Sequence, residues 1–420
     1  MDNYNKKQVL RMSWITALCL MGDSMLYIVL PLHWKEAGLD SLVGVGFILS
    51  INRLVRLPLN PFVSWMYRYI SLRQGLVLAV VLATFTTAGY GLANNFHLWV
   101  ILRCLWGLAW SLLRLGAYYA ILELQTDDNR GRLFGVYNGN YRLGSLFGMI
   151  LGGSMADLYG LLPVSFLFTA LSICISPFLL MNIHVYLPKD KALTQTLNVP
   201  LLRVASIFVL FRAKKIIGLL VTALGSAMMY EGIFTSTLSN FTQSRSTSFF
   251  FLGFSFSAAF LAGGLQALRW GWGPLLSPFI GKLSDQKFST ASLVIAVLSF
   301  AGILFFLFPL PVPTFIWIFV TIGILITSTC MSTLMDSIAA SIATIYSGQE
   351  RNIMTAYSIT LDLGAAIGPI VAFWALQQAG YILIYWGASA VFIGLLINWC
   401  LLMQKSSLRK QVSKKFPPHL

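Results

Sequence analysis

Twelve long apolar stretches constrain the fold of this chain more than any other feature of its sequence. Each has roughly 20 or more residues, the length that lets an α-helix cross a hydrocarbon core of about 30 Å. Inside a bilayer every backbone polar group needs a partner within the protein, so only helices and closed barrels span it. The stretches lie at about 13–33, 42–66, 75–94, 98–122, 133–156, 162–183, 216–240, 250–280, 291–310, 314–343, 353–376 and 381–403. The sequence therefore predicts an all-α integral membrane protein with twelve transmembrane helices.

The amount and the position of charge support a membrane protein. Of the 420 residues, 57% are hydrophobic and 10% are charged, which is too few charges to cover a soluble globule of this size. The net charge of +15 could indicate a nucleic-acid partner, but 21 of the 29 Lys and Arg residues lie in alternate loops and tails. Only Lys35 and Arg245 lie in loops on the other side. This asymmetry is the positive-inside pattern, which predicts a multi-pass protein of the cell membrane with both termini cytoplasmic and no nucleic-acid partner.

Patterns that would indicate an enzyme are missing from the sequence. The five cysteines lie inside apolar stretches, where they form neither a disulfide framework nor a metal-ligand spacing. The sequence also has no nucleophile motif with an oriented base and no phosphate-cradling glycine loop. We therefore expect no cofactor, no bound metal and no enzymatic activity.

An internal repeat divides the chain into two similar parts. The run from Gly135 to Gly153 recurs in altered form, and the same alignment sets the cation Arg142 on the acid Asp362. The matched positions are Val136-Tyr137 with Ala356-Tyr357, Leu143-Gly144 with Leu363-Gly364, Gly148 with Gly368, and Gly160 with Gly380. An even number of stretches precedes the connection between the copies, which indicates a parallel duplication. The predicted parts are a six-helix bundle at 1–183, a cytoplasmic linker at 184–215, a second bundle at 216–404 and a basic cytoplasmic tail at 405–420.

The glycines of the first copy predict a close contact between two helices. Gly144, Gly148 and Gly152 are spaced four residues apart, so they share one helical face and let a neighbouring backbone approach. Arg142 points nearly the opposite way. One face of this helix is therefore expected to pack, while the other is available for chemistry.

These motifs resemble the twelve-helix transporters of the major facilitator superfamily, most closely the drug and metabolite exporters that exchange substrate for protons. The fifth-helix antiporter motif of that group is matched at five glycines, with Met149 where the family has proline. A fourth-helix motif is matched by Arg103 and Gly107, and a loop motif by Gly281 and Asp285, although Arg68 takes the place of the acid in the corresponding first-half loop. The five glycines are Gly135, Gly144, Gly148, Gly152 and Gly153.

The resemblance implies a mechanism and roles for these residues. Two six-helix halves of a monomer would rock about a site at the middle of the bilayer, and the fifth and eleventh helices would be the sliding surface. The motif residues would then serve helix packing and gating. To them we add Gly364, Gly368 and Pro369 of the eleventh helix.

Charged residues inside the apolar stretches are the candidates for the transport site, because such residues are costly in a membrane and face a cavity or a partner. The first half has one acid, Asp23, and five arginines, whereas the second half has one arginine, Arg269, and three acids. The arginines of the first half are Arg53, Arg56, Arg103, Arg114 and Arg142. The acids of the second half are Glu231, Asp336 and Asp362.

The arginines predict a substrate with at least one acidic group. A guanidinium binds a carboxylate or a phosphate through two parallel hydrogen bonds. The expected binding residues are Arg53, Arg56, Arg114 and Arg142, with hydroxyls or ring surfaces from Tyr27 and Tyr137. The alternative is that the arginines pair with acids or backbone carbonyls and tie helices together. We favour that alternative for Arg103, and we leave both roles open for Arg142 with Asp362.

Three acids are candidates for proton coupling, because a buried carboxylate can change its protonation when a nearby cation or water moves. They are Asp23, Glu231 and Asp362, whereas Asp336 is expected to be a partner of Arg114. Asp23 could instead be a structural salt-bridged acid, and Glu231 could bind a substrate amine.

The sequence as a whole favours a proton-coupled exporter of a small amphipathic metabolite or drug that is anionic or zwitterionic. The partners expected from this interpretation are the substrate, protons and the lipid bilayer. An importer of an organic anion that moves together with protons is the nearest alternative. A membrane sensor or scaffold without transport is an alternative from another class.

Overall fold

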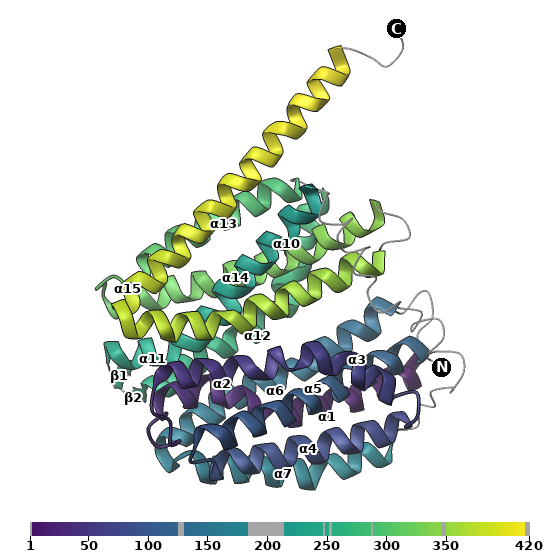
Figure 1. The fold of residues 1–420 in the computed structure, drawn as a ribbon, viewed down its shortest axis with the longest axis vertical. Coiled ribbons are helices and arrows are strands. Elements are labelled where there is room, and N and C mark those ends of the chain that lie inside the picture. The colour runs from purple at the N-terminus through teal and green to yellow at the C-terminus, as the bar shows by residue number, and fades with distance from the viewer. Residues whose placement is uncertain are drawn as a thin grey trace. The chain divides into compact units, whose positions relative to one another are not determined.

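The structure is a computed structural model that describes residues 2–124, 130–183, 214–246, 248–251, 254–286, 289–345 and 350–415. Long helices make up nearly all of it (Figure 1). The predicted linker at 184–215 lies outside the described residues except for its last two, which begin a helix. The end of the predicted tail, 416–420, also lies outside them.

The helices before the linker are seven in the described residues, and two of them divide one predicted stretch. They are α1 (Asp2–Leu32), α2 (Leu42–Leu54), α3 (Arg56–Met66), α4 (Leu72–Leu92), α5 (Phe96–Leu124), α6 (Arg130–Tyr159) and α7 (Leu161–Met181). After the linker come α10 (Lys214–Ala227), the π-helix η1 (Met228–Phe234), α11 (Thr235–Arg245), the strands β1 (Ser248–Phe251) and β2 (Phe254–Ser257), α12 (Ala258–Gln286), α13 (Thr290–Leu307), α14 (Thr314–Ile345) and α15 (Glu350–Lys415).

The all-α membrane fold predicted from the sequence is confirmed. Each of the twelve apolar stretches falls largely within helix. Nine helices of the described residues are long and apolar enough to cross a membrane, and the last of these, Ile353–Leu401, contains a break at Gly380. Twelve membrane crossings therefore remain a prediction.

The predicted stretch at 250–280 is wrong at its beginning. Residues 248–251 and 254–257 form an antiparallel hairpin that pairs Phe249 with Phe256, and α12 begins only at Ala258. The hairpin sequence is rich in Phe, which favours strands, and in Ser, which is a weaker helix former than Ala or Leu. Hydrophobicity alone could not distinguish a strand from a helix at these residues.

Two glycines matched by the repeat share an unusual backbone conformation. Gly160 has φ 83° and ψ 170° and separates α6 from α7, while Gly380 has φ 73° and ψ −173° and breaks α15 in two. This region of backbone space is essentially restricted to glycine. The two glycines that the repeat matches therefore share one backbone conformation.

The described residues form two compact units whose boundaries differ from those of the predicted bundles. Unit 1 comprises the described residues of Met1–Leu201, Gly232–Trp272 and Ala365–Gln377. Unit 2 comprises those of Leu202–Glu231, Gly273–Gly364 and Gln378–Leu420. Parts of α12 and α15 thus belong to the same unit as the first six predicted helices, and the predicted division into bundles stays a prediction.

Unit 1 is built around α1, which packs most extensively on α6. A Cβ added to Gly144 or Gly148 would clash with the backbone oxygens of Ala17 and Met21. The predicted glycine face of α6 is therefore the face on which the α1 backbone lies. Elsewhere in this unit α4 lies beside both α5 and α7 (Figure 1).

Unit 2 has a core of aromatic rings from α13 and α15. The Tyr230 ring of η1 lies 5.7 Å from the Phe305 ring and 5.1 Å from the Phe392 ring. Polar contacts add to this core, because the indole nitrogen of Trp399 donates to the Thr222 hydroxyl at 2.9 Å. Unit 2 thus joins α10 and η1 to the second part of α15.

Alanine at two glycines of α6 should change stability in opposite directions. Gly144→Ala places a methyl group against the Ala17 carbonyl, so it should lower the free energy of unfolding by about 1–3 kcal/mol. Among the described residues nothing lies within 4 Å of a Cβ at Gly135, so Gly135→Ala should gain up to about 1 kcal/mol from helix propensity. Thermal unfolding of the purified protein measures both, and equal shifts in the two melting temperatures would contradict the close contact.

Candidate functional site

A buried ion pair joins three helices of unit 1. The Arg103 guanidinium on α5 binds the Asp23 carboxylate on α1 through Nη1, and its Nε donates to the backbone oxygen of Ile48 on α2 at 3.1 Å. The Arg103 side chain is fully buried and that of Asp23 is 9% exposed. Removing one partner of such a pair leaves an uncompensated buried charge, at a cost of about 3–5 kcal/mol.

The pair retains one unused donor. Nη2 of Arg103 is buried without a hydrogen-bond partner among the described residues. A purely structural bridge is most stable when every buried donor is satisfied. Arg103 therefore has a donor beyond those that bind Asp23 and the Ile48 oxygen.

The structure thus brings together two residues to which the sequence assigned separate roles. Asp23 was a candidate for proton coupling, and Arg103 was expected to tie helices together. This pair agrees with the alternative that arginines in apolar stretches bind acids and tie helices together. At a rise of 1.5 Å per residue, Asp23 lies about 13 Å from the end of α1, and Arg103 lies about 10 Å from the beginning of α5. The two residues therefore lie at similar depths along their helices, which supports their pairing.

Close to this pair, α11 packs on the last turns of α1. Pro31 has no N–H, so the backbone oxygen of Tyr27 lacks its usual helical donor. The Ser239 hydroxyl donates to that oxygen at 3.4 Å, and the Asn240 amide donates to the oxygen of Pro31 at 3.1 Å. Side chains of a second-half helix therefore satisfy the backbone oxygens at this end of α1.

Two further second-half helices pack on first-half helices within unit 1. A Cβ at Gly263 of α12 would clash with the backbone oxygen of Met149 on α6, and one at Gly46 of α2 would meet that of Pro369 on α15. All these contacts lie toward the ends that the charge pattern predicts to be extracellular. They explain why α11 and parts of α12 and α15 belong to unit 1.

The four predicted binding arginines come from four helices of unit 1, and two of them have local contacts. Nε of the buried Arg56 donates to the Asn52 oxygen at 3.1 Å. Arg114 donates to the Tyr118 hydroxyl at 3.3 Å, with its guanidinium 5.5 Å from that ring. Arg53 on α2 is partly buried, and Arg142 on α6 is exposed. Their roles in binding substrate stay predictions.

Arg142 contacts an aromatic residue that the sequence did not single out. Its guanidinium lies 5.1 Å from the ring centre of Trp270 on α12, and the guanidinium of Arg269 lies 5.0 Å from the same ring. A tryptophan between two arginines of different helices has no signal in the sequence, because the contact depends on how α6 and α12 cross.

The two tyrosines predicted to contact substrate are buried in unit 1. The Tyr27 side chain is 6% exposed. Tyr137 is fully buried, its hydroxyl lies 3.3 Å from that of Thr16, and its ring lies 5.1 Å from that of Tyr141. Their surroundings favour packing over direct contact with substrate.

The acids of the second half lie in unit 2. Glu231 is partly buried within η1, and π-helical turns of this kind are frequent at functional sites. Asp336 accepts a hydrogen bond from the Tyr357 hydroxyl at 2.7 Å. Asp362 is partly buried two residues before Gly364, which packs on the Leu224 oxygen of α10. The expected pairs Arg142–Asp362 and Arg114–Asp336 join different units and stay predictions.

The remaining motif residues differ in their surroundings. Gly107 packs on the Asn52 oxygen, Gly152 on the Met25 side chain and Gly153 near the Ala259 oxygen, whereas Gly281 has open space around it among the described residues. Gly368 and Pro369 are buried on α15. The Asp285 side chain lies outside the described part of the chain.

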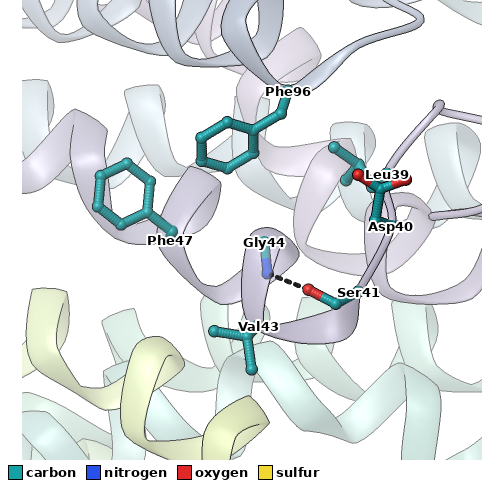
Figure 2. Close-up of a pocket in the computed structure, with 7 residues that line it drawn as sticks. All are labelled: Leu39, Asp40, Ser41, Val43, Gly44, Phe47 and Phe96. Carbon is teal, nitrogen blue, oxygen red and sulfur yellow. Dashed lines mark hydrogen bonds between the residues drawn. The ribbon is translucent and has the colours of Figure 1, made fainter.

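A cavity of about 320 Å³ lies at the connection between α1 and α2 (Figure 2). Its walls include the Asp40 carboxylate and the Phe47 and Phe96 rings, whose centres are 5.7 Å apart. The Ser41 hydroxyl beside it accepts a hydrogen bond from the Gly44 N–H at 3.2 Å and caps α2. None of the predicted site residues lines this cavity.

Comparison with known proteins identifies the family. The model of the Major Facilitator Superfamily matches residues 12–336, well over half of the chain. The chain belongs to the Major Facilitator Superfamily. It is therefore a multi-pass membrane protein of a transporter family, and the resemblance drawn from its motifs is confirmed.

Curated relatives include two resistance proteins. The multidrug resistance protein MdtG of Proteus mirabilis strain HI4320 is 25% identical over 417 residues, which cover 94% of this chain and 96% of that protein. The quinolone resistance protein NorA of Staphylococcus aureus strain Mu50 is 20% identical over 185 residues, 44% of this chain and 47% of that protein.

Solved structures share the fold at low sequence identity. A bacterial homologue of the human lysosomal transporter Spinster, inward-facing and unoccupied, has a TM-score of 0.70 and 14% identity over 96% of each chain. A POT family transporter in complex with 5-aminolevulinic acid has a TM-score of 0.68 and 15% identity over 96% of this chain and 95% of that one. These likenesses support the fold alone.

Removing one charge of the Arg103–Asp23 pair should destabilise the protein more than removing both. Asp23→Asn alone leaves a buried guanidinium without its counter-charge and should cost about 3–5 kcal/mol. The double variant Asp23→Asn/Arg103→Gln should lose less than the two single variants added together. Unfolding of purified variants in detergent measures this, with Arg245→Gln as a control beside the Phe241 ring. Additive losses would contradict direct coupling.

Proposed function

We propose that this chain is a proton-driven exporter of a small amphipathic molecule with an acidic group, either anionic or zwitterionic. The observation that carries the proposal is the buried Arg103–Asp23 pair. A carboxylate enclosed with one cation is a group whose protonation changes the contacts around it. Here those contacts involve α1, α2 and α5 at once.

The geometry suggests how protonation alters the protein. While Asp23 is ionised, it holds Arg103 where Nε reaches the Ile48 oxygen, so the three helices are tied together. Protonation removes the negative charge and weakens the hold on Arg103. Substrate binding to the tied arrangement would then expel the proton, because a ligand favours the state that it binds best. Glu231 and Asp362 are proposed as further proton-binding acids in unit 2.

The relatives support export. Both MdtG and NorA are resistance proteins by name, and the first matches nearly the whole chain. The binding arginines remain Arg53, Arg56, Arg114 and Arg142. The protein would act as a monomer in the cell membrane with both termini cytoplasmic, as its loop charges predict.

Import of an organic anion together with protons is a second candidate, favoured by Met149. Proline at this position belongs to the antiporter motif, and in this chain α6 continues through Met149 as a regular helix. In addition, a bound proton and a bound anion attract each other, so co-transport is electrostatically simpler than exchange. The direction of movement distinguishes the two candidates.

Purified protein in liposomes with an imposed pH gradient tests the proposal. We expect an anionic or zwitterionic amphiphile, with a quinolone among the panel, to move opposite to the protons. The double variant Asp23→Asn/Arg103→Gln should lose gradient-driven movement but retain exchange of labelled for unlabelled compound at equal pH. The control Arg245→Gln should transport normally.

Two outcomes would overturn the proposal. Movement of the compound in the same direction as the protons would establish the importer. Absence of movement for every anionic, zwitterionic and cationic compound, in protein that unfolds cooperatively, would favour a sensor or scaffold.

A further inference from the structure

The cavity beside the connection between α1 and α2 is large enough to hold a small molecule (Figure 2). Its volume is about 320 Å³, and sites for small molecules begin at about 300 Å³. It therefore has room for a compound of one ring and one polar group. Asp40 in its wall is exposed, so the cavity can be reached from water at the helix ends that the loop charges predict to be extracellular.

Two aromatic rings from different helices form much of the apolar wall. The ring centres of Phe47 on α2 and Phe96 at the beginning of α5 lie 5.7 Å apart, with the ring planes inclined at 41°. Both side chains are half-buried, so each ring keeps part of its surface uncovered. In Figure 2, Phe47 and Asp40 lie on opposite sides of Gly44. Such rings suit the apolar body of a ligand and the face of an organic cation.

Asp40 gives the cavity a negative charge. It is the only ionisable residue among the described residues of the wall. No Lys, Arg or His in the described part of the chain forms an ion pair with it. Lys35 of the same connection instead lies over the Trp34 ring, 5.4 Å from the ring centre. A carboxylate without a counter-charge beside two aromatic rings favours a positively charged ligand.

An anion suits the cavity less well, although α2 begins beside it. The beginning of a helix carries a partial positive charge of about half a unit. Here the Ser41 hydroxyl already accepts a hydrogen bond from the Gly44 N–H at 3.2 Å. The carboxylate of Asp40 carries a full negative charge, which exceeds the partial charge of the helix. The balance of charge around the cavity is therefore negative.

Gly44 leaves the space in which a ligand would lie. A Cβ at this position would lie 3.7 Å from Cδ2 of Phe96 and 3.8 Å from Oγ of Ser41, which are ordinary contact distances. The position therefore faces residues of the cavity wall, and a larger side chain would extend into the cavity. Leucine at this position would remove space while keeping the carboxylate and both rings.

We propose that this cavity binds a small aryl ammonium compound, with its ammonium group beside Asp40 and its ring against Phe47 and Phe96. The site is separate from the proposed transport site, so the inference does not rest on the proposed function. The ammonium group also differs in charge from the acidic group of the proposed substrate. The chemistry of the ligand therefore distinguishes the two sites.

Equilibrium dialysis of labelled benzyltrimethylammonium tests the site in purified full-length protein in dodecyl maltoside, a detergent without an ammonium group. Phenylmethanesulfonate carries the same benzyl group with the opposite charge. The wild-type protein should bind the cation at least tenfold more tightly than this anion. Asp40→Asn and Phe96→Leu should each weaken binding of the cation about fivefold, because each removes one of its attractive contacts. Gly44→Leu should weaken binding at least tenfold by filling the cavity.

Three matched controls should keep the affinity for the cation within twofold. Glu36→Gln removes another exposed acid of the same connection, and Phe85→Leu removes an exposed ring of α4. Gly387→Leu adds the same side chain where no described residue lies within 4 Å of a Cβ. Equal weakening by Glu36→Gln and Asp40→Asn would show a response to surface charge alone and would overturn the proposal.

Three other outcomes would also overturn it. The first is equal affinity for the cation and the anion in the wild-type protein. The second is loss of cation binding in Glu231→Gln with full binding in Asp40→Asn, which would place the cation in unit 2. The third is competition by glycerophosphocholine as strong as that by unlabelled benzyltrimethylammonium, which would assign the cavity to lipid head groups. None of these results depends on the direction of transport.

Discussion

A charge in the interior of a membrane must have a partner or polar surroundings, and this constraint determines much of the arrangement of unit 1. Arg103 satisfies it by binding Asp23 and the Ile48 oxygen, which fixes α5 against α1 and α2. Arg56 and Arg114 find partners on or near their own helices. Arg142 instead reaches across to an aromatic ring of another helix. The contacts of these arginines therefore differ, since those of Arg103 join three helices and that of Arg142 joins α6 to α12.

The helix α6 packs on different helices with its two sides. Its glycines remove side-chain volume toward α1, so the two backbones lie in contact. Its other side follows α12, first through Met149 against Gly263 and then through Arg142 at Trp270. A movement of α12 relative to α6 would therefore change both the backbone contact and the arginine pair around the indole.

The sequence predicted local features well, because they depend on residues close together in the chain. Hydrophobic length located the helices, four-residue spacing located the packed face of α6, and the repeat matched Gly160 with Gly380, whose backbone conformations agree. The hairpin before α12 was missed, since an apolar run rich in Phe suits either a strand or a helix. The π-helical turn at Glu231 also had no visible signal.

Contacts between distant helices were harder to predict, because they depend on crossing angles and depths. The sequence placed Arg103 and Asp23 among possible pairs but could not choose between the available acids. It did not indicate Arg269 and Trp270 as partners of Arg142, since a tryptophan in an apolar helix resembles ordinary packing. Charges in apolar stretches therefore supplied the candidate residues, while their grouping required the three-dimensional arrangement.

The central claim is that Asp23 exchanges a proton with solvent when substrate binds, and proton exchange on binding tests it most directly. Purified protein in weak buffer is mixed with a compound that it transports, and a pH indicator records the protons exchanged. The account predicts proton release by the wild-type protein and none by the Asp23→Asn/Arg103→Gln variant at matched occupancy. Equal release by both proteins would contradict the account. Proton uptake by the wild-type protein would also contradict it, and would favour import of the substrate together with protons.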